Sequence, residues 1–311
     1  MGKRPQVTVL GSLNMDISVT VPRLPGPGAT VLGSAARFTP GGKGANQAVA
    51  AARLGADTTM VGCVGDDEFG QRLIAALRAE GIDAAGVRVV AEVPTGLAMI
   101  AIDKSGENLI TVAPGANYQV GPADVAAAGA RPRDVLVISA EIPVPAIRSA
   151  LAGGRGTLCV FNLAPVPETA AAALVADGAP DWLVVNESEA AAVLGRPVAG
   201  LADAGRAAAE LVAVGPRHAV VTAGAHGAAL AGPDGTDTIP GFRVTAVDTV
   251  GAGDTFVGAL AAALAAGVSA AEAVRAAAAA GATAATRPGT QAGMPRPEDI
   301  RAVTGLIWPV R

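Results

Sequence analysis

Short apolar runs rich in β-branched residues recur along this chain and alternate with alanine-rich stretches that have helical spacing. The runs cover residues 7–10, 136–138, 183–185 and 219–222, and the stretches include residues 45–54, 70–80, 190–194 and 204–213. Continuous apolar runs are typical of strands buried on both faces, and their alternation with helices predicts a parallel sheet. We therefore expect an α/β fold built on a mainly parallel sheet.

Two segments, residues 16–38 and 95–112, depart from this rhythm. In the second, residues 96–102 and 108–112 flank the turn Asp103-Lys-Ser-Gly106, which predicts a β-hairpin. Strands without an intervening helix cannot belong to a βαβ unit, so we expect a separate small sheet that can close over a ligand. Because internal repeats and long linkers are absent, we predict one domain at residues 5–308, with lid strands from about 14–40 and 95–115.

Composition narrows the possible functions of the 311-residue chain. The charged fraction is 16% and the formal net charge is -4, so there is no general basic field for nucleic acid or an anionic membrane. The cysteines, Cys63 and Cys159, lie in apolar contexts that favour buried thiols in a reducing compartment. With His218 and His226 as its histidines, the chain cannot build a histidine-rich metal site. The sequence shows neither a signal-peptide core nor a membrane-spanning apolar run, so we expect a cytoplasmic protein.

The segment Thr39-Pro-Gly-Gly-Lys-Gly-Ala-Asn-Gln-Ala48 places glycines and a lysine directly before a predicted helix. Unpaired backbone N–H groups and the helix dipole favour a polar or anionic ligand at such a point. The segment is not a Walker A loop, because glycine replaces Ser/Thr after Lys43. A turn that only caps the helix is the simpler alternative, but Lys43 and Asn46 are placed for a ligand.

Gly11-Ser-Leu-Asn-Met-Asp16 follows the first predicted strand. Polar residues at the carboxyl end of a parallel strand occupy the crevice where α/β sheets bind ligands. Asn14 and Asp16 are therefore candidates for binding hydroxyl groups. Taken alone, an Asn-x-Asp pattern is also typical of ordinary turns, so it gains weight only beside the other motifs.

Asp254 lies in the segment Val247-Asp-Thr-Val-Gly-Ala-Gly-Asp-Thr-Phe256, which leads into an apolar helix at residues 257–266. The glycine-containing turn at residues 251–253 allows backbone N–H groups to converge as an anion hole. Asp254 falls in the first helical turn, where a helix cap is the simpler alternative, although a cap does not need the two preceding glycines. A dinucleotide-dependent dehydrogenase is set aside, because Gly-x-Gly-x-x-Gly does not follow the first strand.

Four motifs occur in order across nearly the whole chain: Gly11-Ser-Leu-Asn-Met-Asp16, Gly41-Gly-Lys-Gly-Ala-Asn-Gln47, Gly115-Ala-Asn117 and Asp248-Thr-Val-Gly-Ala-Gly-Asp254. Together they resemble the ribokinase-like carbohydrate kinases of the PfkB family. The last motif marks the wider family, whereas the first two are similar to its ribokinase branch. The resemblance implies a ribokinase-like three-layer αβα fold with a mainly parallel central sheet and a small β-sheet lid.

The resemblance also assigns residues to the two substrates. It implies that the sugar is held under the lid by Asn14, Asp16, Gly42, Lys43, Asn46 and Glu141. It implies that Asp254 faces the phosphorylated hydroxyl and that the anion hole is formed by Gly251, Ala252 and Gly253. For the nucleotide it implies a binding site formed by Asn186, Glu189, Thr222, Ala223, Gly224, Ala225, His226, Gly227 and Gly253. The segment Asn186-Glu-Ser-Glu189 resembles the family's magnesium and phosphate motif, but its residues alone equally fit a helix start.

A monovalent-cation site, for K⁺, is implied as well. The matching positions, most of which offer backbone carbonyls, are Asp248, Val250, Ala284, Arg287, Gly289 and Gly293. Gly293 departs from the serine of the family pattern, which removes a hydroxyl and weakens the case for potassium activation. Residues 276–280 are alanines where a polar residue near the adenine is expected, so we expect a looser nucleotide preference.

The predicted reaction transfers phosphate from Mg-ATP to the 5-hydroxyl of D-ribose and gives ribose 5-phosphate and ADP, with Asp254 as the base. Phosphoryl transfer depends mainly on positioning and electrostatics, for which a carboxylate base suffices. A same-fold kinase for 2-deoxyribose, a nucleoside or a ketohexose stays open, and so does a non-catalytic sugar-binding module. We expect no nucleic-acid or membrane partner, and the exposed lid edge predicts a homodimer through the lid sheet.

Overall fold

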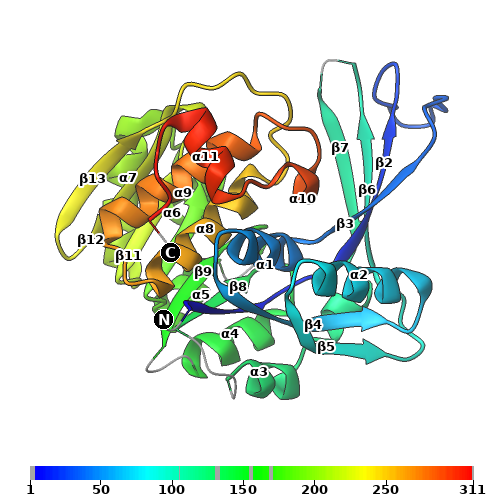
Figure 1. The fold of residues 1–311 in the computed structure, drawn as a ribbon, viewed down its shortest axis with the longest axis horizontal. Helices are drawn as coiled ribbons and strands as arrows, with labels where there is room; N and C mark the ends of the chain where they lie inside the picture. Colours follow the sequence, from blue (N-terminus) through cyan, green and yellow to red (C-terminus); the bar gives the residue numbers. More distant parts are fainter. Residues whose placement is uncertain (1–3, 105, 130–133, 154–156, 168–170, 310–311) are drawn as a thin grey trace.

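A nine-stranded central sheet and a four-stranded lid sheet form the β-structure of the residues that the computed structural model describes, namely 4–104, 106–129, 134–153, 157–167 and 171–309 (Figure 1). The strand order of the central sheet is β13-β12-β11-β10-β9-β8-β1-β4-β5. Its strands are β1 (Gln6–Leu10), β4 (Asp57–Gly65), β5 (Asp83–Val90), β8 (Val135–Ser139), β9 (Leu158–Asn162), β10 (Trp182–Asn186), β11 (His218–Thr222), β12 (Gly227–Gly232) and β13 (Gly235–Pro240). Neighbouring strands from β5 to β11 are parallel, whereas β12 and β13 add an antiparallel edge.

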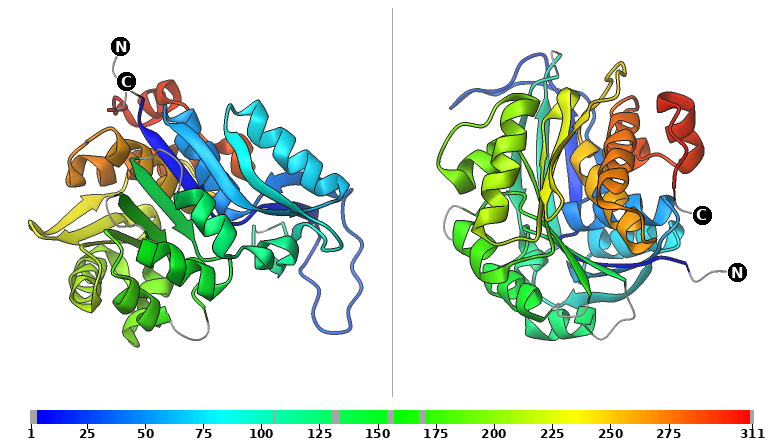
Figure 2. Two further views of the ribbon diagram at one scale, coloured as in Figure 1. Left: turned by 90° about the horizontal axis from the view of Figure 1, so that it is seen from below. Right: turned by 90° about the vertical axis from the view of Figure 1, so that its left-hand side faces the viewer.

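Helices cover both faces of the central sheet (Figure 2). Val135 and Val137 join the core on one face, and Leu136 and Ile138 join the core on the other, because successive side chains of a strand alternate. The first face carries α1 (Lys43–Arg53), α2 (Glu68–Ala79), α8 (Ala252–Ala265), α9 (Ala270–Ala284) and α11 (Pro297–Thr304). The second carries α3 (Pro122–Gly129), α4 (Val144–Gly153), α5 (Ala171–Gly178), α6 (Glu187–Leu194) and α7 (Gly200–Val214). Burial on both faces explains why the strand sequences are continuously apolar.

The sequence predictions for the body agree with this architecture. The four predicted runs are strands β1, β8, β10 and β11, and the four predicted helical stretches lie in α1, α2, α6 and α7. The alanine-rich C-terminal region forms α8 and α9, where small side chains allow close helix packing. Among the described helices, none has both the length and the apolar character needed to cross a bilayer.

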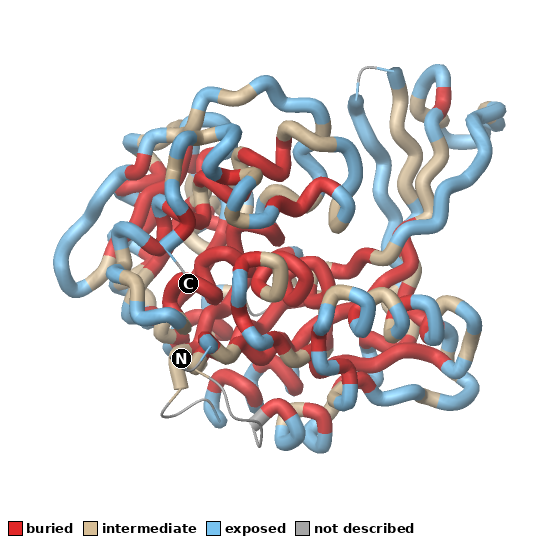
Figure 3. The backbone as a smooth tube through the Cα atoms, viewed as in Figure 1, coloured by how far each residue is buried: buried red, intermediate tan, exposed pale blue. Residues whose placement is uncertain are grey.

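The lid sheet stands away from the body and consists of β2 (Asn14–Thr20), β3 (Arg37–Gly41), β6 (Gly96–Ile102) and β7 (Asn108–Ala113), in the order β3-β2-β6-β7. The predicted hairpin is the antiparallel pair β6–β7; Ser105 of its turn lies outside the described residues. The parallel pairing of β2 with β6 begins at Asn14 and Gly96. Figure 3 shows that the lid is largely exposed, whereas the root of β2 is buried.

The carboxyl ends of the parallel strands bring polar residues to one edge of the central sheet. The strand register pairs Ser139 at the end of β8 with Asn162 at the end of β9. It also pairs Asn186 at the end of β10 with Thr222 at the end of β11. This is the edge at which open α/β sheets bind ligands.

Candidate active site

Asp254 lies in the first turn of α8, a helix that begins after a left-handed glycine. The N-cap of α8 is Gly251, with φ 82°, and no side chain caps the helix. The simpler interpretation of Asp254 as a cap is therefore wrong. Instead, its carboxylate turns toward α1, where Oδ2 accepts a hydrogen bond from Nδ2 of Asn46 at 2.9 Å and Oδ1 accepts one from Nε2 of Gln47 at 3.1 Å. Each carboxylate oxygen is thus held by one amide while Asp254 stays 8% exposed.

The amide of Gln47 links Asp254 to the sheet. Its Nε2 also donates to Oδ1 of Asn162 at 2.9 Å, and Nδ2 of Asn162 donates to the carbonyl of Val184 at 3.1 Å. Sequence reasoning assigned no role to Gln47 or Asn162. A signal for Asn162 was present, because it is a polar residue that ends an otherwise apolar strand.

Glu141 and Gly42 shape the N-terminus of α1. Gly42 has φ 89°, and a Cβ there would lie 2.8 Å from Cα of Leu13, so the conformation and the space both require glycine. Oε2 of Glu141 accepts hydrogen bonds from the backbone N–H of Lys43 at 3.1 Å and from the hydroxyl of Ser12 at 2.5 Å. A carboxylate at this position satisfies an otherwise unpaired N–H and interacts favourably with the helix dipole.

The charges around α1 perturb one another. The nearby Asp254 carboxylate raises the pKa of the Lys43 ammonium, against the opposing effect of burial, and Glu141 adds to the increase. Burial raises the pKa of Asp16 to about 7, with further contributions from Glu141 and Asp254 and an opposing one from Lys43. Such a cluster of carboxylates around one ammonium is typical of functional sites.

Asn14 and Asp16 lie on β2, at the root of the lid. Asn14 is 2% exposed, and its Oδ1 accepts a hydrogen bond from Nδ2 of Asn117 at 2.7 Å. Oδ1 of Asn117 in turn accepts from the backbone N–H of Leu13 at 2.8 Å. Asn117, from the motif at residues 115–117 to which the sequence analysis gave no role, therefore orients the side chain of Asn14.

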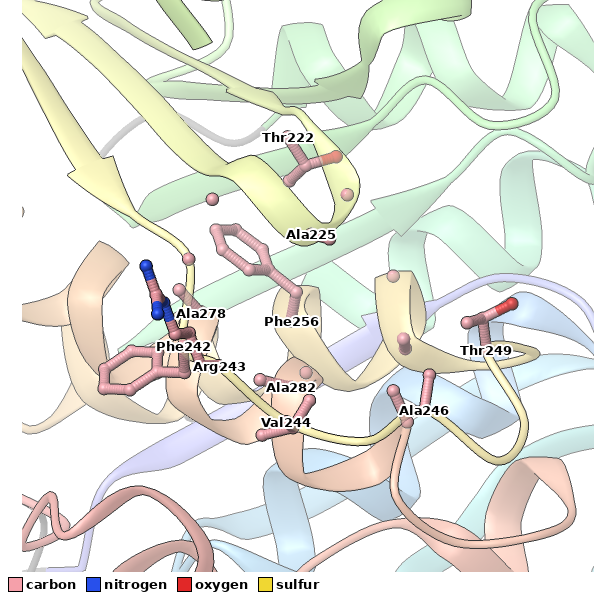
Figure 4. Close-up of a pocket in the computed structure, with 17 residues that line it drawn as sticks. Thr222, Ala225, Phe242, Arg243, Val244, Ala246, Thr249, Phe256, Ala278 and Ala282 are labelled. Atoms are coloured by element: carbon pink, nitrogen blue, oxygen red, sulfur yellow. The ribbon is translucent and has the colours of Figure 1, made fainter. Parts of the chain in front are cut away.

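A cavity of about 520 Å³ opens beside the N-terminus of α8, between the β11–β12 loop and α9. Figure 4 shows the side chain of Phe256 pointing between the loop that carries Ala225 and the helix that carries Ala278. Of the predicted nucleotide residues, those on its wall are Thr222, Gly224, Ala225, Gly227 and Gly253. Ala223 and His226 belong to the same loop but are not among the lining residues. The α9 wall consists of small residues, which include Ala278, Gly281 and Ala282.

A smaller cavity of about 130 Å³ lies between the large cavity and α1, and it shares Thr222 and Gly253 with the large one. Lys43, Asp254, Asn186 and Glu189 all line it. It therefore connects the nucleotide-sized cavity to the carboxylate of Asp254. Asn14, Asp16 and Glu141 are not on the wall of either cavity.

Asn186 and Glu189 form a capping box at the start of α6. Oδ1 of Asn186 accepts from the backbone N–H of Glu189, and Oε2 of Glu189 accepts from the backbone N–H of Asn186, both at 2.8 Å. The helix-start interpretation is correct, and the same residues also face the small cavity. Burial raises the pKa of the Glu189 carboxyl, while the Asn186 N–H and Lys43 act in the opposite direction.

The predicted cation residues lie in two segments, residues 248–250 before α8 and residues 284–293 from the end of α9 to α10. The carboxylate of Asp248 accepts from the N–H groups of Val250 at 3.0 Å and Gly289 at 2.9 Å. A Cβ at Gly293 would lie 3.2 Å from the carbonyl oxygen of Arg287 and 3.5 Å from that of Ala284. The carbonyls of Arg287 and Ala284 therefore both lie close to Gly293. Within the described residues, no group of three or more His, Cys, Asp or Glu side chains is gathered around a metal site.

Comparisons with known proteins agree with this geometry. Residues 4–297 match the model of the pfkB family carbohydrate kinases. A ribokinase of Haemophilus influenzae is 36% identical over 299 residues, which cover 94% of this chain and 96% of the relative. A deoxyribokinase of Salmonella typhi is 34% identical over 257 residues, which cover 82% of this chain and 84% of the relative.

A solved structure of Arabidopsis thaliana ribokinase, complexed with ribose and ATP, superposes with a TM-score of 0.85. It is 29% identical, and the match covers 98% of this chain and 100% of that chain. The chain belongs to the pfkB family of carbohydrate kinases.

Proposed function

We propose that this chain is a ribokinase, which transfers the γ-phosphate of ATP to the 5-hydroxyl of D-ribose and releases ribose 5-phosphate and ADP. The observation that carries this proposal is the place of Asp254. Its buried carboxylate borders the small cavity at the N-terminus of α8, beside Lys43 and next to the nucleotide-sized cavity. A carboxylate there can accept the proton of a sugar hydroxyl as that hydroxyl attacks the phosphate.

The sugar, in this proposal, lies between the root of the lid and α1. It would be held by Asn14, Asp16, Gly42, Lys43, Asn46 and Glu141. Asn14 and Asp16 approach from β2, and the others belong to the body. A site divided in this way assembles fully when the lid covers the sugar, which also excludes water as a competing acceptor.

ATP would occupy the large cavity with its phosphates directed toward Gly251, Ala252 and Gly253. The first N–H groups of a helix lack intrahelical partners and stabilise an anion. Asn186 and Glu189 would hold Mg²⁺, whose oxygen preference suits the carboxylate and amide that face the small cavity. Mg²⁺ would neutralise phosphate charge when bound.

The carbonyls of Ala284 and Arg287, together with the segments around Asp248, Val250, Gly289 and Gly293, would hold K⁺.

We also propose a homodimer through the lid, because Met99 and Leu109 are 48% and 46% exposed. Because successive side chains of a strand alternate between the two faces, both residues lie on the face of the lid that does not carry Asp16. Replacing Met99 and Leu109 with lysine should give a monomer by light scattering. Cytoplasmic function is supported by the buried thiol of Cys63. Residues 5–308 would form the single kinase domain.

Asp254→Asn is the direct test of the proposed reaction. The variant keeps the size of the side chain, so it should fold and bind ribose. ADP release in a coupled assay should fall by about a thousandfold or more, because the proton acceptor is lost. The matched control is Asp234→Asn, which changes an exposed carboxylate in the β12–β13 turn and should leave turnover unchanged. A near-normal kcat for Asp254→Asn contradicts the proposal.

A second candidate, phosphorylation of 2-deoxyribose, is favoured by the similarity to the Salmonella deoxyribokinase. A site that hydrogen-bonds the 2-hydroxyl rejects the analogue that lacks it. The comparison of kcat/KM for ribose and 2-deoxyribose therefore decides between the two. Equal values, or a preference for 2-deoxyribose, would remove ribose as the assigned substrate. Absence of ADP release with every sugar would instead indicate a non-catalytic module.

A further inference from the structure

The side-chain amide of Asn46 has one favourable orientation. Asn46 is 5% exposed, so its polar atoms depend on protein partners. Nδ2 donates to Oδ2 of Asp254 at 2.9 Å, and Oδ1 accepts from Nε2 of Gln291 at 3.0 Å. A turned amide would bring Oδ1 against the carboxylate of Asp254, where two acceptors repel each other. The donor on Gln291 thus favours the orientation that Asp254 needs.

Gln291 belongs to the short helix α10 (Thr290–Gly293), which is fixed to α1 at a second point. Nη1 of Arg53 donates to the main-chain carbonyl of Gln291 at 2.6 Å and to that of Met294 at 2.9 Å. The same guanidinium pairs with Glu80 through Nε at 3.0 Å and Nη2 at 2.6 Å. Because Arg53 binds the main chain, α10 keeps this attachment when the side chain of Gln291 is changed.

We propose that Gln291 is a positioning residue that acts through Asn46 to orient the carboxylate of Asp254; this inference rests on the proposed function. The side chain of Gln291 donates to Asn46, and its main-chain carbonyl accepts from Arg53. Asp254 is held by one donor on each oxygen, so a free Asn46 amide leaves only the Gln47 donor in place. The carboxylate then loses its fixed direction toward the sugar hydroxyl, and a small loss of alignment at the reacting atoms costs a large factor in rate.

The test uses the full-length protein with Gln291→Met, which keeps the size of the side chain and removes its donor. Steady-state ADP release is measured against ribose and Mg-ATP, and melting is followed in parallel. We expect kcat to fall by about tenfold or more, whereas KM for Mg-ATP stays within about twofold of the parent value. Gln71→Met, on the exposed side of α2, is the matched control and should change neither parameter. Gln291→Glu, which also lacks a donor when ionised, serves if the methionine variant is poorly folded.

A double-mutant cycle with Asn46→Ala separates positioning from a merely structural role. If Gln291 acts through Asn46, Gln291→Met has no further effect on kcat in the Asn46→Ala background. A full effect in that background, or a kcat within about twofold of the parent for both Gln291 variants, overturns the inference. Neither result affects the proposed function, which depends on Asp254→Asn. If Asp254→Asn turns over normally, the proposed function fails first.

Discussion

The carboxylate of Asp254, on helix α8, helps to raise the pKa of Asp16, on lid strand β2, to about 7. The charge of Asp254 therefore affects the protonation of Asp16, although the two residues belong to different parts of the fold. Burial is the larger cause, and Glu141 contributes as well. The carboxylates of Asp254, Glu141 and Asp16 outnumber the Lys43 ammonium that opposes their effect. A proton on Asp16 reduces this excess of negative charge.

Asp16→Asn should stabilise the sugar-free protein at alkaline pH. In the unfolded chain Asp16 ionises near 3.8, whereas in the folded protein it holds its proton up to about 7. The folded state binds the additional proton between these values, so the contribution of Asp16 to stability falls as the pH rises through this window. Melting temperatures without sugar should therefore increase more for Asp16→Asn at about pH 8 than at about pH 5. An equal change at both pH values would contradict the raised pKa.

Ribose affinity should weaken as the pH falls below about 7. An ionised Asp16 accepts hydrogen bonds from sugar hydroxyls, and the proton that it takes up at lower pH removes acceptor capacity. Calorimetric titration of ribose should give a Kd that rises by up to about tenfold per pH unit below this value. Asp16→Asn should bind ribose weakly at all pH values and lose this dependence. A Kd of the parent protein that does not change between pH 5 and pH 8 would argue against a sugar contact by Asp16.

Gly42→Ala should destabilise the protein more than Gly28→Ala. Both glycines have positive φ, but a Cβ at Gly28 meets nothing within 4 Å, whereas one at Gly42 meets main-chain atoms of the Gly11–Asn14 loop. Strain alone costs about 1 kcal/mol, so we expect about that loss for Gly28→Ala and more than about 2 kcal/mol for Gly42→Ala. Denaturant unfolding measures both. Similar losses for the two variants would show that the close approach at Gly42 is relieved at little cost.

Gly293→Ser should strengthen the response to K⁺. The Cβ position lies at 3.2 Å and 3.5 Å from the carbonyls of Arg287 and Ala284, so a small side chain fits after a slight shift. The added hydroxyl supplies another oxygen to the proposed shell. The K⁺ concentration that gives half-maximal activation should fall for Gly293→Ser but not for Gly293→Ala, which adds the same Cβ without the oxygen. Identical titrations for the two variants would remove position 293 from the cation site.

The fold was predictable from the sequence because the strands of a parallel sheet are buried on both faces. The runs at β1, β8, β10 and β11 are mostly apolar, whereas a strand buried on one face alone would alternate apolar with polar residues. Two interior strands that are largely buried, β4 and β9, were not predicted either. β5 and β13 were missed because they lie at the edges of the sheet, where exposed residues interrupt the apolar run. β12 was missed because its sequence, Gly-Ala-Ala-Leu-Ala-Gly, lacks β-branched residues.

The site was predictable only in part, for a physical reason. Glycines and charged residues before a helix point to ligand chemistry, which made Lys43 and Asp254 visible. Hydrogen bonds between distant segments leave no local pattern, so the contacts of Gln47 with Asn162 and of Asn46 with Gln291 depended on the three-dimensional structure. The helix-start pattern at Asn186 was correct but incomplete, because a capping box and a cavity wall can share residues.

The position of Asp16 near the root of β2 gives the lid the geometry of a lever. Strand β2 is 7 residues long and leaves the body at Asn14. At about 3.3 Å per residue, Asp16 lies roughly 7 Å from this pivot and Thr20 roughly 20 Å. A rotation of the lid about its root would therefore move the tip about three times as far as Asp16. A rotation that moves the tip far enough to admit a sugar would therefore move the sugar-binding carboxylate of the lid only about a third as far.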